Sequence, residues 1–139
     1  MSTAVILDDD ALHHLGEQLG DSGILCGFLD RYLALLEQRI ARLERALAAA
    51  DRDDWIDAVL SLKTSSAMAG AQALTEEAAR LQRESACWPW WCTPTRASVT
   101  RRAECISGLR RLAAETARQL RAFLLQVADS TRAADSRCT

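Results

Sequence analysis

The sequence predicts an all-α fold: an antiparallel, up-down bundle of four helices with an additional short helix at the N-terminus. Good helix formers, chiefly alanine, leucine, arginine and glutamate, dominate the composition. Only two prolines and six glycines interrupt the 139 residues. Apolar residues recur at spacings of three and four, as on one face of a helix. The length favours one domain, expected over residues 1–128, followed by a flexible tail at residues 129–139.

Polar caps and glycines delimit the first two helices. One of the aspartates at positions 8–10 is expected to cap a short helix that ends at Gly20. After a link at residues 21–23, a long helix is expected from Ile24 to about Ala50, because its apolar residues lie three or four positions apart. Such short links force neighbouring helices to run antiparallel, which predicts the up-down order.

The same signals delimit the remaining three helices. Asp51 or Asp53 is expected to cap the third helix, and Gly70 is expected to stop it. Residues 87–95 separate the last two helices, because the two prolines in that segment break any helix. The three helices are expected at about residues 51–68, 72–86 and 96–128.

The third predicted helix has one buried face and one exposed face. On a helical wheel of about 100° per residue, apolar and small residues form one narrow stripe, as in a buried seam. The stripe consists of Trp55, Val59, Leu62, Ser66 and Ala69. Leu60 lies about 140° from the centre of the stripe, one turn after Ile56. Two apolar residues there, beside Lys63 and small residues, indicate a contact patch.

The stretch at residues 60–71 resembles the signature of histidine-phosphotransfer (HPt) domains. In that family the stretch reads His-x-Leu-Lys-Gly, then small residues, then Gly-Ala. The matching residues are Leu62, Lys63, Ser65, Ser66, Gly70 and Ala71. The order and lengths of the helices are also similar to the family over about residues 8–128. Lys63 is the only lysine beside sixteen arginines. A compact ammonium differs from a planar guanidinium, so this lysine supports the alignment.

The resemblance implies an HPt-type bundle in two-component phosphorelay signalling, with a response-regulator receiver domain or a histidine kinase as partner. Two departures change the expected chemistry. Leu60 stands where the family has its phosphorylated histidine, and leucine has no nucleophilic nitrogen that accepts a phosphoryl group. Thr64 stands where the family has a glycine that leaves room for the receiver. His13 and His14 lack the lysine three residues later, so neither is expected to substitute.

We therefore expect a pseudo-phosphotransfer domain, not an enzyme, that docks its partner without accepting phosphate. The sequence lacks a convergent set of acids, a glycine-rich loop and a nucleophile–base pair, which also argues against an enzyme. The expected docking residues are Ile56, Leu60, Lys63, Thr64 and Ala67.

The segment at residues 87–95 holds three of the four tryptophans. Trp88, Trp90 and Trp91 are costly to leave in water, so they are expected to cover the end of the core. An alternative is a second interface for a partner or a homodimer, since tryptophan is a common hot-spot residue. A cofactor pocket is a weaker alternative. Cys87 and Cys92 allow a local disulfide or a redox switch, although their spacing is not a standard metal or redox spacing.

Charge and composition exclude several other classes. The formal net charge of −2 and the isoelectric point of 5.7 give no general attraction to nucleic acid or anionic membranes. Arginines at residues 96–121 alternate with acids and apolar residues, which favours a solvated face over a nucleic-acid patch. We expect no metal, no cofactor, no membrane span and a cytoplasmic location.

Overall fold

The computed structural model describes residues 5–91 and 95–137, without the side chains of residues 90 and 131–137. Over these ranges the chain is all-α, as the sequence predicts. Its elements are α1 (Asp9–Leu19), α2 (Ser22–Ala48), α3 (Arg52–Met68), α4 (Gln72–Ser85), the 3₁₀ turn η1 (Pro89–Trp91) and α5 (Arg96–Arg137).

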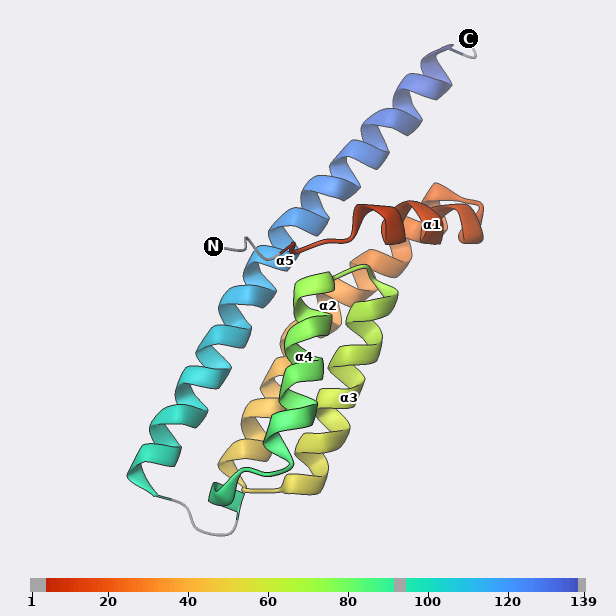
Figure 1. The fold of residues 1–139 in the computed structure, drawn as a ribbon. Coiled ribbons are helices and arrows are strands. Elements are labelled where there is room, and N and C mark those ends of the chain that lie inside the picture. Colours follow the sequence, from red (N-terminus) through yellow and green to blue (C-terminus); the bar gives the residue numbers. More distant parts are fainter. Residues whose placement is uncertain (1–4, 92–94, 138–139) are drawn as a thin grey trace.

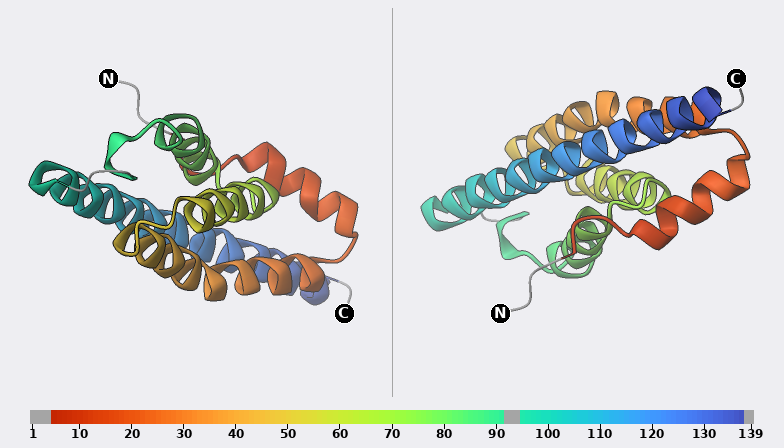
Figure 2. Two further views of the ribbon diagram at one scale, coloured as in Figure 1. Left: turned by 90° about the horizontal axis from the view of Figure 1, so that it is seen from below. Right: turned by 90° about the horizontal axis from the view of Figure 1, so that it is seen from above.

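The four long helices run alternately up and down (Figure 1). Each of them packs against two of the others. Helix α3 packs against α2 and α4, and α5 packs against the same two helices from the other side. Helix α1 crosses one end of the bundle and packs against α2. The end views in Figure 2 show α1 reaching from the α4 side of the bundle to the start of α2. The predicted four-helix bundle with one additional helix is confirmed.

Aspartates cap the first three helices. The side chains of Asp8, Asp21 and Asp51 accept hydrogen bonds from backbone N–H groups at the start of α1, α2 and α3. Each carboxylate accepts from a backbone N–H that has no partner within its helix. The negative charge of the carboxylate is also favourable there, because the N-terminus is the positive end of the helix dipole. Asp51, not Asp53, is therefore the cap of α3.

The predicted seam of α3 lies inside the core. Trp55, Val59, Leu62, Ser66 and Ala69 are all fully buried. Ser66 is the polar member of the seam, and its hydroxyl lies 2.8 Å from the hydroxyl of Tyr32 on α2. The periodicity of the sequence therefore gave the correct rotation of α3 about its own axis.

The turn between α3 and α4 anchors the N-terminal segment. Gly70 has a φ of +71°, and the backbone N–H groups of Gly70 and Ala71 donate to carbonyls in the last turn of α3. This is the Schellman arrangement, in which a left-handed glycine ends a helix. Asp8 N donates to the Gly70 carbonyl over 2.9 Å, and Ala73 N donates to the Ile6 carbonyl over 3.2 Å. These two bonds fix the start of α1 against the signature turn.

Cross-helix bonds set the register of α5 against α2. Arg110 forms ion pairs with Glu37 and Glu44 on α2, at 3.2 and 3.1 Å. Arg102 donates to the carbonyl of Leu47 near the end of α2. The ion pairs are exposed, so each contributes little to stability, but together these contacts favour a single offset between the two helices.

The fifth helix is longer than predicted. It continues to Arg137 and projects beyond the other helices (Figure 1), so the predicted end near Ala128 is wrong. No glycine or proline lies between Leu109 and Arg137, and alanine and arginine are good helix formers, so no local signal stops the helix. Helix α5 thus includes part of the predicted tail, and the flexibility of that tail stays a prediction. None of the helices in the described ranges is long and apolar enough to span a membrane.

Candidate functional site

The outer face of α3 carries the residue at the centre of the predicted site. Leu60 is 46% exposed, and Thr64 and Ala67 are also exposed. Met68, two turns after Leu60, is 57% exposed. These positions lie opposite the buried seam, so the same helical period that buries Trp55 exposes Leu60. The residue predicted to stand at the signature's histidine position is therefore an apolar surface residue.

Ile56 belongs only in part to this exposed face. Its side chain is half-buried and packs against the core. Because it follows Trp55 by one residue, or about 100° around the helix, it lies at the edge of the buried stripe. Only the outer part of its side chain is open to a partner.

The only lysine of the chain is oriented by a residue of α4. The Lys63 ammonium is half-buried and donates a hydrogen bond to Gln82 Oε1 over 3.0 Å. An ammonium has three donors, so this bond leaves others for a partner. Sequence reasoning did not identify Gln82, because the two residues are nineteen positions apart. Only the packing of α3 on α4 brings them together.

A groove runs between α2 and α3 beside Leu60. It is an open depression of about 520 Å³, and a smaller hollow of about 150 Å³ adjoins it and shares Arg39, Ser65 and Met68. The larger depression is lined by Arg39, Asp57, Leu60, Ser61, Thr64, Ser65 and Met68. Two of the predicted docking residues, Leu60 and Thr64, line it. Arg39 comes from α2 and had no signal in the sequence, since its place depends on helix packing.

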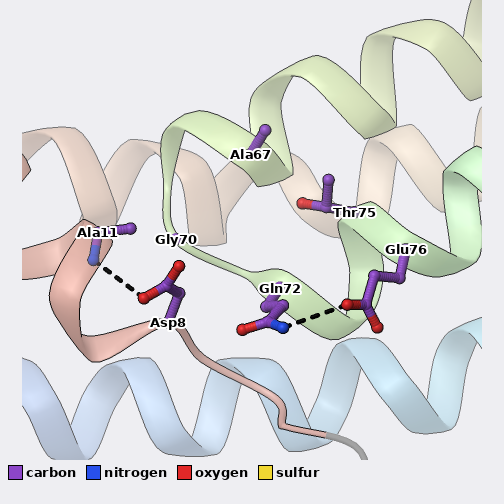
Figure 3. Close-up of a pocket in the computed structure, with 7 residues that line it drawn as sticks. All are labelled: Asp8, Ala11, Ala67, Gly70, Gln72, Thr75 and Glu76. Carbon is purple, nitrogen blue, oxygen red and sulfur yellow. Dashed lines mark hydrogen bonds between the residues drawn. The ribbon is translucent and has the colours of Figure 1, made fainter.

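A second hollow lies at the far end of the same helix face (Figure 3). It measures about 340 Å³ and is lined by Asp8, Ala11, Ala67, Gly70, Gln72, Thr75 and Glu76. Asp8 Oδ1 accepts from Ala11 N, and Gln72 Nε2 donates to Glu76 Oε1, both over 3.1 Å. Ala67 therefore faces a different hollow from Leu60 and Thr64. The structure thus places Leu60 and Thr64 at the groove and Ala67 at the second hollow. Lys63 lies on a third side, against Gln82 of α4.

No histidine lies on this face of α3. The two histidines of the chain, His13 and His14, are both on α1. The His13 ring packs edge-on against Phe123 of α5, with centroids 6.3 Å apart. Within residues 5–91 and 95–137, no three histidine, cysteine, aspartate or glutamate side chains are grouped so as to hold a metal ion. This face offers apolar surface and hydroxyls, and its charged groups are Lys63, Arg39 and the carboxylate of Asp57.

The tryptophans after α4 pack onto the end of the core. Trp88 and Trp91 are half-buried, and their ring centroids lie 5.6 and 6.2 Å from that of the fully buried Trp55. Trp91 Nε1 donates to the Ser85 carbonyl over 2.7 Å. Both rings thus cover the core, which limits the surface that they offer to a partner. The Trp90 side chain lies outside the described residues, and the second interface stays a prediction.

The two cysteines of this segment differ in what the structure describes. Cys87 is exposed with a free thiol, while Cys92 lies outside the described residues.

Cys105, on α5, is half-buried, and burial is the main reason why its pKa is raised to about 11. The neutral thiol is therefore the dominant form of Cys105 at neutral pH.

Comparison with known proteins agrees with this geometry. No curated protein matches the chain. Among solved structures, histidine-containing phosphotransfer protein B (HptB) from Pseudomonas aeruginosa PAO1 has a similar fold, with a TM-score of 0.71 and 23% sequence identity. The match covers 89% of this chain and 98% of that protein. The family model for the Hpt domain matches residues 27–130. The chain therefore belongs to the Hpt domain family, whose members interact with receiver domains and histidine kinases in phosphorelays.

Proposed function

We propose that this chain is a pseudo-phosphotransfer domain: it docks a receiver domain or a histidine kinase and accepts no phosphoryl group. The observation that carries the proposal is Leu60, an exposed apolar residue at the signature's histidine position. Phosphoryl relay needs a nucleophilic nitrogen that attacks an aspartyl phosphate and later releases the group. A leucine side chain cannot do this. On this proposal the chain is no enzyme, and it acts in the cytoplasm.

The composition of the face supports docking. Leu60 and Met68 are large apolar side chains that water solvates poorly, and they lie two turns apart on one helix face. Lys63, oriented by Gln82, sits beside them. Protein interfaces typically combine an apolar centre with a polar rim. The proposed mechanism is occupancy: a scaffold for, or a competitor of, the proteins that bind a receiver.

Binding is tested with purified receiver domains and the variant Leu60→Glu. A charge at the centre of the contact should weaken binding by about tenfold or more, which is about 1.4 kcal/mol. The matched control is Leu125→Glu, because Leu125 is 67% exposed and lies on the projecting part of α5. Isothermal titration calorimetry measures both variants. Equal affinity of Leu60→Glu and the unchanged protein would contradict docking through this face.

Phosphoryl transfer is tested by incubating the chain with an active kinase and a phosphorylated receiver. We expect no acid-labile phosphate on the unchanged protein. Its appearance there would overturn the pseudo-phosphotransfer proposal. The double variant Leu60→His/Thr64→Gly restores both signature residues and should regain acceptance. The single variant Leu60→His should accept less, because the Thr64 side chain crowds the same exposed face.

A further inference from the structure

Arg39 differs from the other half-buried arginines that the structure describes. Arg42 pairs with Asp54 at 2.7 Å, Arg110 pairs with two glutamates, and Arg102 donates to a backbone carbonyl. Arg39 has no ion pair or hydrogen bond within the described ranges, and its Nη1 is buried. Buried charged donors in proteins normally have acceptors. Arg39 also lines the groove between α2 and α3, so a guanidinium without a partner among the described residues lies in the wall of the groove.

Two hydroxyls line the same groove. Ser61 and Thr64 are both lining residues. Within residues 5–91 and 95–137, neither hydroxyl donates a hydrogen bond. Ser65 is different, because its hydroxyl already donates to the carbonyl of Ser61 over 2.8 Å. The groove therefore combines one guanidinium with two free hydroxyl donors. A guanidinium with its planar fork of N–H groups suits oxyanions, and hydroxyls add further donors.

We propose that Arg39, Ser61 and Thr64 form a binding site for a tetrahedral phosphoryl oxyanion. The group is held by hydrogen bonds and charge alone, so no bond to phosphorus forms or breaks. Its source is either free inorganic phosphate or the phosphorylated aspartate of a docked receiver. The second source rests on the proposed function, while the first does not. On this proposal Thr64, which replaces the signature's glycine, is a ligand for the group that the missing histidine would otherwise accept.

Two further charged residues lie around the groove, and they act on a bound anion in opposite directions. Arg31 lines the adjoining hollow and adds a second positive charge. Asp57 lines the groove itself, is exposed, and forms no ion pair with Arg39. A carboxylate there opposes a bound anion. Removal of Asp57 should therefore strengthen anion binding, whereas removal of Arg39 should abolish it.

The first experiment titrates the isotope-labelled protein with inorganic phosphate and follows backbone and arginine side-chain signals by NMR. We expect saturable shifts at Arg39, Ser61 and Thr64 with a dissociation constant of about 1–10 mM. Arg39→Gln should lose these shifts, and Asp57→Asn should lower the dissociation constant several-fold. Arg45→Gln is the matched control, since Arg45 is an exposed arginine of the same helix. Unchanged phosphate shifts in Arg39→Gln, or no saturable shifts in the unchanged protein, would overturn the site.

The second experiment compares receiver domains with and without beryllofluoride, a stable mimic of the aspartyl phosphate. The unchanged protein should bind the beryllofluoride form several-fold more tightly, and Arg39→Gln should bind both forms equally. An undiminished preference in Arg39→Gln would exclude the receiver's phosphoryl group as the ligand. Failure of any receiver to bind would contradict the proposed function, whereas the phosphate titration would still decide the oxyanion site.

Discussion

The hydroxyl groups of Tyr32 and Ser66 lie 2.8 Å apart inside the core and join α2 to α3. Both residues are buried, so neither hydroxyl can turn to bulk water. Ser66→Ala should lower the free energy of unfolding by about 1–3 kcal/mol, because it leaves the tyrosine hydroxyl without a partner. Urea denaturation followed by circular dichroism measures the change.

The double variant Ser66→Ala/Tyr32→Phe is the control for this bond. It removes both polar groups at once, so it should cost less than the sum of the two single variants. Additive losses would mean that the hydroxyls do not interact in solution.

Burial raises the pKa of Tyr32 to about 12, although the Ser66 hydrogen bond and the nearby Arg39 oppose the shift. The unfolded chain loses this proton near pH 10, whereas the folded protein retains it to about pH 12. Stability from Tyr32 is therefore complete below pH 10 and falls as pH rises from 10 to 12, by up to about 3 kcal/mol. Unfolding free energies of the unchanged protein and Tyr32→Phe between pH 9 and about 12 test this. Parallel pH profiles would contradict it.

Gly70 is required at the signature turn for two reasons. Its φ of +71° disfavours other residues, and an added Cβ would lie 2.9 Å from Cγ of the buried Leu12. Gly70→Ala should cost about 2–4 kcal/mol, from backbone strain and overpacking. Gly27→Ala is the matched control, since Gly27 is exposed in α2 with open space around it, and it should stabilise by about 0.5–1 kcal/mol. Equal effects of the two variants on the urea midpoint would refute this account.

Trp88 and Trp91 are expected to stabilise the folded chain and not to mediate self-association. Trp88→Ala or Trp91→Ala should each cost about 2 kcal/mol, because each ring packs on the buried Trp55. Leu125→Ala, at an exposed site, should stay within about 0.5 kcal/mol. Light scattering measures the mass in parallel. A mass that halves in the tryptophan variants would instead support the homodimer interface.

Cys105 should react far more slowly than Cys87. The raised pKa of Cys105 reduces its thiolate fraction at pH 8, and its half-buried position limits access, whereas Cys87 is exposed. Brief alkylation with iodoacetamide, read by peptide mass spectrometry, should label Cys87 at least about tenfold faster. The difference should vanish in denaturant. Equal labelling of the native protein would contradict the burial of Cys105.

The sequence by itself determined the features that depend on nearby residues. Helical period buries Trp55 and Leu62 and exposes Leu60, because side-chain direction repeats every 3.6 residues whatever the helix packs against. The caps and the left-handed Gly70 follow from interactions within a few positions. The prediction that Leu60 stands at the histidine position rests on the sequence alone.

Only the tertiary structure decided which side chains from different helices meet. The Lys63–Gln82 bond and the place of Arg39 beside Leu60 depend on how far each helix slides and rotates against its neighbour. No local pattern encodes that offset, since it results from the packing of the whole core. The same packing leaves Ile56 half-buried. It also places Ala67 beside a hollow that is lined by residues of α1 and α4. The residues that identify the site thus lie on α3, whereas α1, α2 and α4 complete its shape, and α2 adds the charge of Arg39.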